Sequence, residues 1–259
     1  MSTVSLIGSG NVAWHLAHVL SHGGVSVEWI WSRQAGHAES LAREVKGQPT
    51  TRMSDVSRSS GAVLVCVPDH AIPDVLVEAA DSGLSSHLVC HTSGATPVDV
   101  FPPAYSRFGV FYPLQTLTKG HHVDFDHLPV LITSHDHAVQ HELTGPANRI
   151  TDRVVYVTDV ERRQIHMAAV MVNNFVYHLC DRAFSRVESQ GLDGSLLYPL
   201  LKETVRKIVD FRQEGVQTGP AIRHDLNTLY AHLKLLADEP GLASMYRQLS
   251  RSINPELEL

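Results

Sequence analysis

The chain has 259 residues, a length that fits one large domain or two domains of moderate size. Hydrophobic residues make up 43% of it and charged residues 19%, as in a globular protein, and the net charge of -6 argues against a nucleic-acid-binding surface. No apolar run approaches the length of a membrane span, and the first expected strand begins too near the N-terminus to leave room for a signal peptide. We therefore expect a cytoplasmic protein that binds neither nucleic acid nor a membrane.

The cysteines and histidines do not indicate a redox or metal site. Cys66, Cys90 and Cys180 are widely separated, and the first two lie in apolar runs, as buried reduced thiols do. The seventeen histidines include the pair His137 and His141, whose spacing suits a shared metal ligand but lacks the glutamate of a zinc-protease helix. We expect surface histidines and no metal site.

The first element is the most informative part of the chain. An apolar strand at residues 4–7 runs into Gly8-x-Gly10-x-x-Ala13, and helical periodicity follows. Gly8 permits a tight turn, Gly10 permits close approach of a pyrophosphate, and Ala13 lets the helix pack closely on the strand. The pattern predicts a dinucleotide-binding βαβ unit with the phosphates at the helix N-terminus. The residues expected at the pyrophosphate are Gly8, Ser9, Gly10, Asn11 and Val12.

The second predicted strand, Val25–Trp31, bears on the choice of cofactor. Ser32 and Arg33 follow it and offer a hydroxyl and a guanidinium group, which suit a ribose 2′-phosphate. Glu28 lies at a plausible spacing for the acid of an NAD site, but it falls in mid-strand. NADP is therefore expected, with NAD the weaker alternative.

Strand and helix signals then alternate through the first half. A helix is predicted at 35–45, a short strand at 47–51 and a buried strand at 62–67, after which Asp69 should cap a helix through Ala79. Further strands are predicted at 87–90, 107–112, 128–133 and 153–158. This alternation predicts an α/β fold with a doubly wound, mainly parallel Rossmann sheet.

Only helical periodicity follows Thr158. We expect Asp159 to cap a long helix, a turn at 191–194, a second helix ending near Phe211, a third opened by Gly219-Pro220, and a fourth after Pro240-Gly241. The predicted domains are thus 1–158, which binds NADP, and 159–259, which is helical. About a hundred helical residues barely bury a core of their own, so we expect a homodimer through this domain.

Three predicted loops follow strands and carry polar groups: 68–70, 91–94 and 112–116. Because the carboxyl ends of parallel strands share one edge, these loops should line one cleft. Ser93 and Gln115 could bind the nicotinamide amide or a substrate carbonyl there. Each loop taken singly is equally well explained as a capped turn.

The first helix of the second domain carries polar residues on a broad face. His166, Asn173 and Asn174 stand among Ala, Val and Met at helical spacing. They are either buried polar groups that have hydrogen-bond partners within the core, or part of a catalytic site. In such a site His166 would be the general acid or base and Asn174 would position a substrate. Further along, Arg223 either clamps a carboxylate or phosphate or pairs with Asp225.

These motifs occur along nearly the whole chain and in a fixed order: Gly8-Ser-Gly-Asn-Val-Ala13, Val67-Pro-Asp69, His91-Thr-Ser-Gly94, Tyr112-Pro-Leu-Gln-Thr116, His166 with Asn173-Asn174, and Thr218-Gly-Pro-Ala-Ile-Arg-His-Asp225. The chain resembles a bacterial family with a Rossmann-like N-terminal domain and an uncharacterised helical C-terminal domain. That family is related to pyrroline-5-carboxylate reductases, deazaflavin-dependent NADP reductases and 3-hydroxyisobutyrate dehydrogenases. The resemblance implies that Val67, Pro68 and Asp69 belong to the cofactor site, and that a cleft lies between the domains.

The resemblance leaves the reaction open. Val170 occupies the position at which the hydroxyacid dehydrogenases carry a catalytic lysine, so His166 takes that role or the chemistry differs. We expect an NADP-dependent oxidoreductase that transfers a hydride between nicotinamide and a C=O or C=N carbon of a small polar molecule that bears a carboxylate. The alternatives are a catalytically silent NADP-binding sensor or scaffold, and the same hydride chemistry with a deazaflavin.

Overall fold

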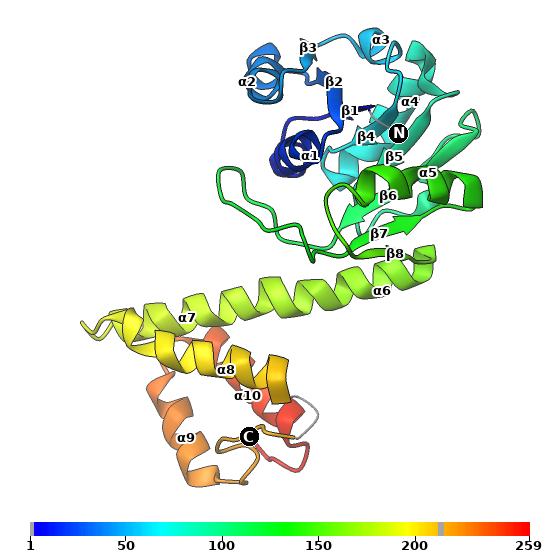
Figure 1. Cartoon of the computed structure of the whole chain (residues 1–259). Helices are drawn as coiled ribbons and strands as arrows, with labels where there is room; N and C mark the ends of the chain where they lie inside the picture. Colours follow the sequence, from blue (N-terminus) through cyan, green and yellow to red (C-terminus); the bar gives the residue numbers. More distant parts are fainter. Residues whose placement is uncertain (1–2, 212–214) are drawn as a thin grey trace. The chain divides into compact units, whose positions relative to one another are not determined.

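One eight-stranded sheet organises the N-terminal part of the chain (Figure 1). The structure is a computed structural model that describes residues 3–211 and 215–259. The strands lie in the order β3-β2-β1-β4-β5-β6-β7-β8, and every neighbouring pair is parallel except β6 with β7. Their bounds are β1 Thr3–Ile7, β2 Ser26–Trp31, β3 Gln48–Thr50, β4 Ala62–Val65, β5 Leu88–His91, β6 Arg107–Pro113, β7 Val130–Thr133 and β8 Val154–Tyr156. The order reverses between β1 and β4, which is where such sheets bind ligands.

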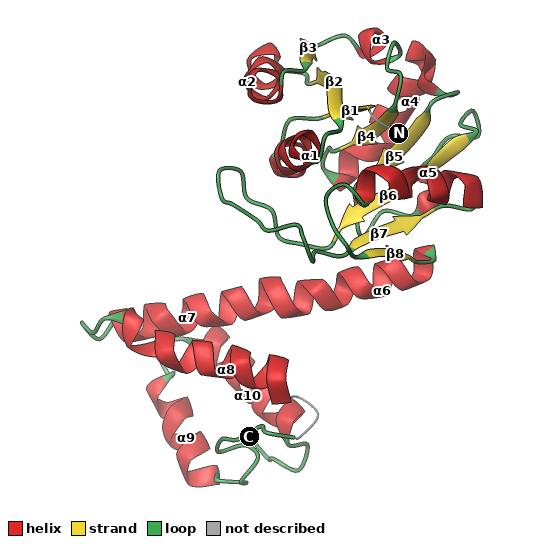
Figure 2. Ribbon diagram, viewed as in Figure 1, coloured by secondary structure: helices red, strands yellow, loops and turns green. Residues whose placement is uncertain are grey.

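Helices cover both faces of the sheet (Figure 2), which explains the continuous apolar strands. On β4, Ala62 and Leu64 pack in one core, whereas Val63 and Val65 pack in the other. The first core includes α1 (Asn11–His22), α2 (Ala35–Val45) and α5 (His137–Ala147), and the second includes α3 (Met53–Val56) and α4 (Ile72–Ala79). The doubly wound Rossmann prediction is confirmed.

Two predicted helix starts in the sequence are wrong in detail. Asp69 does not cap α4: it begins a short 3₁₀ turn, Asp69–Ala71, and α4 follows at Ile72 with no side-chain cap. Asp159 is the first residue of α6 (Asp159–Val170), and Thr158 caps it instead. The Thr158 hydroxyl accepts the Glu161 N–H while the Glu161 carboxylate accepts the Thr158 N–H, a complete capping box. Asp159 is thereby free for a tertiary contact.

The long predicted helix is present but not uniform. It runs as α6, a π-helical turn at Met171–Phe175, and α7 (Val176–Glu188). By its contacts the chain divides into two compact units, Met1–Asn174 and Phe175–Leu259, so α6 belongs to the unit that contains the sheet. The predicted domain boundary at 158/159 stays a prediction.

The second unit consists of helices: α7, α8 (Tyr198–Phe211), α9 (Leu226–Leu235) and α10 (Pro240–Ile253). Gly219-Pro220 does not open α9, contrary to the sequence prediction. Residues 220–224 form turns instead, and α9 begins at Leu226 because the Asp225 carboxylate accepts the Thr228 N–H. Pro240 does stand in the first turn of α10, as a helix N-terminus favours.

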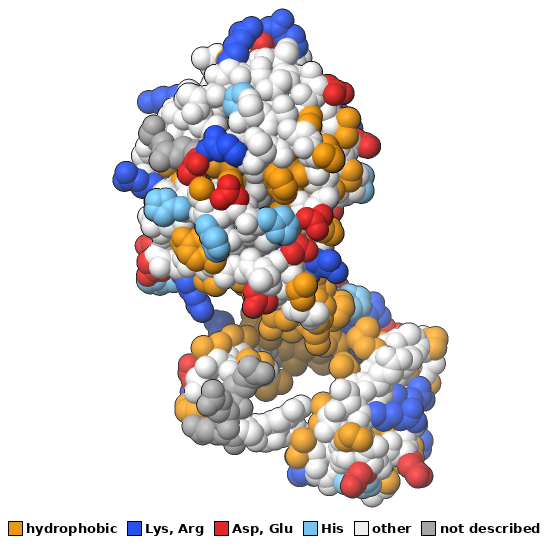
Figure 3. Space-filling model, turned by 90° about the vertical axis from the view of Figure 1, so that its right-hand side faces the viewer, with side chains coloured by type: hydrophobic (Ala, Val, Ile, Leu, Met, Phe, Trp, Pro, Cys, Tyr) orange, Lys and Arg blue, Asp and Glu red, His pale blue; other side chains and the backbone are white. Residues whose placement is uncertain are grey.

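Few side chains are buried in the second unit. Its buried hydrophobic cluster is Ala221, Leu229 and Leu257, while α7 and α8 bury none of their residues. Hydrophobic side chains gather on the surface of the helical part of the chain (Figure 3). Among the described residues, no helix is both long and apolar enough to span a membrane.

Candidate functional site

The turn between β1 and α1 forms an open cradle of backbone groups. Gly8 has φ +122°, and a Cβ there would collide with the carbonyl oxygen of Cys66, so only glycine fits. A Cβ on Gly10 would meet nothing within 4 Å, which leaves open space in front of the helix. The first turn of α1 has no side-chain cap and no acidic residue, so its N–H groups and the positive end of its dipole are available to an anion. These residues fit a dinucleotide pyrophosphate.

The end of β2 continues this cradle. Ser9 Oγ donates to Ser32 Oγ at 3.1 Å, and the Gln34 N–H donates to the same Ser32 oxygen at 3.3 Å. Ser32 is thus buried and fixed, whereas the Arg33 side chain beside it is exposed. A guanidinium group on a fixed turn suits a phosphate on the adjacent ribose.

Glu28 is occupied elsewhere. Its carboxylate accepts the Ser60 N–H at 2.8 Å and the Ser60 hydroxyl at 2.6 Å, on the segment that precedes the amino end of β4. Burial raises the pKa of this carboxyl, but the hydrogen bonds from Ser60 and Ser59 outweigh burial and leave the pKa lowered. Glu28 therefore serves the opposite end of the sheet and cannot read a ribose at the carboxyl ends of the strands.

A loop covers the start of α1. The Asn11 side-chain oxygen accepts the Lys119 N–H at 3.2 Å, and the buried His15 contacts the Thr118 carbonyl through Nε2 at 3.0 Å. Asn11, predicted as a phosphate contact, thus also ties the β6–β7 connection to the cradle. At the end of β4, Val67 is half-buried while Pro68 and Asp69 are exposed.

A cavity of about 540 Å³ opens within the first unit, between the end of β6 and the helix that starts at Asp159. Its volume is in the range of small-molecule sites. Its lining combines an apolar wall with hydroxyl, imidazole and amide groups: Tyr112, Leu114, Gln115, Thr116, Ile165, His166, Ala168, Ala169, Val170, Val172, Asn173 and Asn174. Three of the four predicted catalytic residues, His166, Asn174 and Gln115, therefore meet on one cavity.

A tyrosine–histidine pair stands in this cavity. The Tyr112 hydroxyl lies 3.0 Å from His166 Nδ1, and their rings meet edge to face. Gly94 makes room for the pair, because a Cβ there would collide with His166 Nδ1 and lie 2.7 Å from Tyr112 Cζ. Burial and the charge of Asp69 raise the pKa of Tyr112, while the Arg162 charge opposes them. The phenol is therefore protonated at neutral pH.

The amides reach the cavity from two elements. Asn173 and Asn174 lie in the π-helical turn, a distortion that often marks functional positions in helices. Gln115 follows β6, and its side-chain oxygen accepts the Thr116 N–H at 2.8 Å, which leaves its NH₂ group free to donate. Val170 lines the same wall and brings no proton donor.

Ser93 does not line this cavity. It is buried in the loop after β5, where its hydroxyl oxygen accepts the N–H groups of Ala95 at 3.1 Å and Thr96 at 2.9 Å. The capped-turn interpretation therefore describes Ser93 in the structure. Its single hydroxyl proton is the only group left for a ligand.

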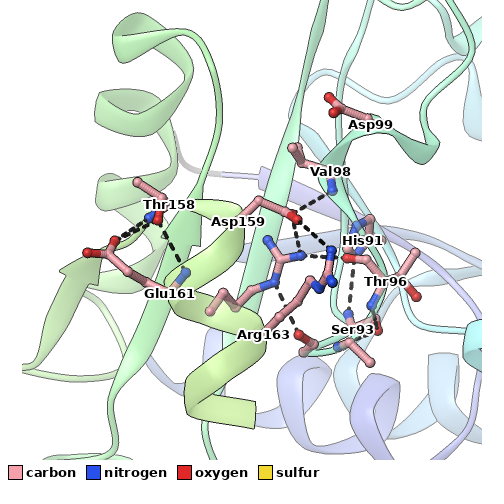
Figure 4. Close-up of polar contacts among 12 residues, drawn as sticks. His91, Ser93, Thr96, Val98, Asp99, Thr158, Asp159, Glu161 and Arg163 are labelled. Carbon is pink, nitrogen blue, oxygen red and sulfur yellow. Dashed lines mark hydrogen bonds and ion pairs between the residues drawn. The ribbon is translucent and has the colours of Figure 1, made fainter. Parts of the chain in front are cut away.

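Buried polar contacts join the loop after β5 to α6, and Figure 4 shows Asp159 of α6 next to Val98. Arg162 has no exposed surface; its guanidinium donates to the Gly94 carbonyl at 3.4 Å, the Thr96 carbonyl at 2.5 Å and the Asp159 carboxylate at 2.7 Å. Asp159 also accepts the Val98 N–H at 2.7 Å. One turn before His166, this junction fixes the helix that carries the imidazole. Sequence reasoning missed it, although an arginine four residues before His166 on the same predicted face was a usable signal.

His91, at the end of β5, is the most perturbed imidazole. It is fully buried, its Nδ1 accepts the Ser93 N–H at 3.2 Å, and its ring stacks on Phe101. Burial, together with the nearby Arg162 charge, lowers the pKa of His91 to about 4. The residue is a neutral structural group at neutral pH.

Two other predicted features lie outside the cavity. Asp225 caps α9 through Thr228, and Arg223, in the turn before it, is exposed. Cys66 and Cys90 are buried, and burial raises the pKa of both thiols, that of Cys66 to about 12. In the part of the chain that the structure describes, no group of three or more His, Cys, Asp or Glu side chains is placed to hold a metal ion.

Comparison with known proteins agrees with this architecture. Family models match a Rossmann-like domain at residues 2–115 and a domain of unknown function, DUF2520, at residues 128–253. The solved structure titled "putative NADP oxidoreductase BF3122", from Bacteroides fragilis, has 32% sequence identity, 98% coverage of both chains and a TM-score of 0.91. A search of curated proteins finds no match.

More distant solved structures share the fold alone. A reductive aminase from Aspergillus terreus in complex with NADPH and ethyl-5-oxohexanoate is 15% identical, with 98% of this chain and 93% of that chain covered and a TM-score of 0.72. An imine reductase from Myxococcus stipitatus in complex with NADP+ is 17% identical, with coverages of 96% and 93% and a TM-score of 0.69.

Proposed function

This chain belongs to the family in which a Rossmann-like domain is combined with the helical DUF2520 domain, and from that premise we propose that it is an NADP-dependent oxidoreductase. The reaction is hydride transfer between the nicotinamide and a C=O or C=N carbon of a small polar molecule. The observation that carries the proposal is the uncapped N-terminus of α1 behind Gly8 and Gly10, at the point where the strand order reverses.

The residues around the cradle support NADP over NAD. Gly8, Ser9, Gly10, Asn11 and Val12 surround the pyrophosphate position, and Val67, Pro68 and Asp69 follow the neighbouring strand. Arg33 is exposed beside the fixed Ser32, where it would bind a 2′-phosphate, while Glu28 is held by Ser60 and leaves no acid for the ribose hydroxyls. The NADP complexes among the distant structures agree with this choice.

The cavity residues divide the remaining work. Bound NADPH supplies the hydride. His166 manages the proton that accompanies it, since among the described lining residues it is the one that brings an imidazole to the cavity. Asn174 and Gln115 donate hydrogen bonds that orient the substrate, and Ser93 has one hydroxyl proton for the nicotinamide amide or the substrate. The hydroxyl and amide lining around an apolar wall suits a small polar carbonyl or imine compound.

A homodimer and a cytoplasmic location complete the proposal. Large hydrophobic side chains on α7, α8 and the π-helical turn are 42–75% exposed, among them Phe175, Val176, Tyr177 and Val209. A monomer rarely leaves so many exposed on one set of helices, so we assign this surface to a second copy. Three free cysteines agree with a reducing compartment.

A silent NADP-binding sensor is the second candidate. Val170 favours it, because this position on the cavity wall carries no lysine. The pair formed by Tyr112 and His166 favours an enzyme, because a protein that only binds nucleotide does not need an imidazole hydrogen-bonded to a phenol in a separate cavity.

The test has two stages. Calorimetry of the purified chain should show binding of NADPH, and binding of NADH that is weaker; absence of both would contradict the enzyme and the sensor alike. A panel of small ketones, aldehydes, ketoacids and cyclic imines should then contain compounds that oxidise NADPH in the presence of the protein. NADPH binding with no turnover across the panel would favour the sensor.

A further inference from the structure

The inference drawn here rests on the proposed hydride transfer and assigns its proton. We propose that the Tyr112 hydroxyl gives the proton to the substrate. His166 then replaces that proton by donating the one on its Nδ1 to the phenol oxygen. Tyr112 is then a catalytic residue that none of the sequence motifs singled out for that role.

The position of Tyr112 suits a contact with the reacting atoms. It is the penultimate residue of β6, and strand β6 ends at the same edge of the sheet as β1, β4 and β5, where the dinucleotide cradle lies. Its side chain lines the cavity, and the charge of Asp69, in the loop after β4, reaches its hydroxyl. Tyr112 therefore stands between the cofactor loop and the cavity wall on α6.

The hydrogen bond to His166 orders the two groups. In the tautomer that carries the proton on Nδ1, the phenol oxygen accepts a hydrogen bond from Nδ1–H, and its own O–H can donate into the cavity. In this arrangement Nδ1 is occupied by Tyr112, and the imidazole contacts a substrate only through Nε2. The raised pKa of Tyr112 keeps the phenol protonated at neutral pH, which a general acid requires.

The step balances as a reduction. The hydride would leave C4 of the dihydronicotinamide, which is oxidised, and form a C–H bond at the substrate carbon; the π bond of C=O or C=N then breaks and its electron pair moves to the oxygen or nitrogen. That atom takes the proton of Tyr112 Oη, the phenol oxygen takes the Nδ1 proton of His166, and the imidazole takes a proton from solvent at Nε2. In the oxidative direction every proton moves the opposite way.

Neighbouring residues fix the positions of the Tyr112 and His166 rings. A side chain at position 94 would collide with His166 Nδ1 and Tyr112 Cζ, so the two rings meet only across a glycine. The Gly94 carbonyl in turn accepts from Arg162, one turn before His166 on α6. Strand β6, the loop after β5 and helix α6 thus converge on this one hydrogen bond.

The test compares Tyr112→Phe with Tyr156→Phe, and His166→Gln with His127→Gln, in the full-length protein. Tyr156 and His127 are exposed, and neither lines the cavity, so they serve as matched controls. Calorimetric NADPH affinity should stay within about threefold of wild type in all four variants. With a substrate from the panel, Tyr112→Phe should lower kcat by about 10²–10³-fold with little change in KM, as removal of a general acid does. His166→Gln should lower kcat by a smaller factor.

A second readout needs no substrate. The tyrosine absorbance titration of the free protein should lose one high-pH transition in Tyr112→Phe, and the same transition should move in His166→Gln but not in His127→Gln. If Tyr112→Phe keeps kcat within threefold while His166→Gln abolishes turnover, the imidazole is the donor and the inference is wrong. An unmoved transition in His166→Gln would also overturn it. Failure of NADPH binding or of all turnover in the wild type would instead contradict the proposed function.

Discussion

At several positions of this site the absence of a side chain or of a polar group is what the structure requires. Gly8 and Gly94 each stand where a Cβ would collide, the first with the Cys66 carbonyl and the second with the Tyr112–His166 pair. Val170 supplies an apolar wall to the cavity and brings no proton donor. In our proposal the proton chemistry falls to side chains from β6 and from the preceding turn of α6.

Arg33 is expected to decide between the two nicotinamide dinucleotides. Replacing it in Arg33→Ala removes a charge-assisted hydrogen bond to the 2′-phosphate, which is worth about 1.5–3 kcal/mol, or roughly 10–100-fold in affinity. Calorimetry should show that loss for NADPH and an affinity for NADH within about twofold of wild type. Arg43→Ala, an exposed arginine near the other end of α2, is the control. Equal losses for both cofactors would show that Arg33 does not read the phosphate.

Gly94→Ala should separate the tyrosine from the histidine. The added methyl group needs the space of His166 Nδ1 and Tyr112 Cζ, so overpacking should destabilise the protein by about 1–3 kcal/mol. We expect kcat to fall at least about tenfold while NADPH affinity holds, because the cradle lies on another loop. Gly36→Ala, where a Cβ meets nothing within 4 Å on α2, should leave kcat unchanged. Wild-type kcat in Gly94→Ala would contradict the close approach.

At the scale of elements, the β5 loop and α6 are joined by buried polar groups. Arg162 has no exposed surface and donates to the carbonyls of Gly94 and Thr96 as well as to Asp159. A buried cation contributes little net stability by itself, but removing its partners leaves a costly unpaired charge. The junction therefore holds the His166-bearing helix in one position relative to the sheet.

His91 makes this junction sensitive to acid. Its folded-state pKa of about 4 lies below the ordinary value of 6.5, because burial and the Arg162 charge disfavour the imidazolium. As the pH is lowered, His91 therefore binds a proton in the unfolded chain before it does so in the folded protein. The contribution of His91 to the free energy of unfolding is constant above about pH 6.5 and falls as the pH drops from 6.5 to 4. The loss amounts to about 3 kcal/mol.

Urea unfolding measured between pH 4 and pH 8 checks this expectation. The stability of His91→Asn should fall less steeply than wild type between pH 6.5 and pH 4, because asparagine still accepts the Ser93 N–H but does not titrate. His135→Asn, an exposed histidine paired with Asp99, should keep the wild-type slope. Parallel slopes in wild type and His91→Asn would show that His91 does not titrate in this range.

At the scale of the whole molecule, the helical unit exposes many large apolar side chains and buries few. Neither α7 nor α8 has a buried residue, and Tyr177 and Val209 are 75% and 74% exposed. A second copy would cover this surface through a symmetric interface. We expect this association to complete the packing of the helices.

Sedimentation of the purified chain should show a dimer at micromolar concentration. Val209→Asp on α8 would bury an unpaired carboxylate in the interface, and we expect it to raise the dimer Kd by about 100-fold or more. Val160→Asp, equally exposed near the start of α6, should remain dimeric. A wild-type monomer, or an unaffected Val209→Asp dimer, would assign the exposed helices to another partner.

The sequence by itself determined the sheet and its cofactor cradle. Continuous apolar runs specify strands, and the Gly8–Ala13 spacing specifies a strand, turn and helix, because these signals depend on neighbours within a few residues. Helix α2 begins and ends where its periodicity predicted, and Ser32 and Arg33 follow β2 as expected. Asp69 and Asp159 were mistaken for caps because both lie close to a helix start. In the structure a 3₁₀ turn separates Asp69 from α4, and Thr158 caps α6.

Only the tertiary structure decided which polar groups meet. It placed Glu28 beside Ser60 and Tyr112 beside His166, and these partners are 32 and 54 positions apart in the chain. Hydrogen bonds of long sequence separation depend on how strands and helices pack, and no local pattern encodes that packing. The same reason explains why sequence reasoning missed the buried Arg162 junction: the carbonyl groups that accept its hydrogen bonds belong to a loop 66–68 residues earlier.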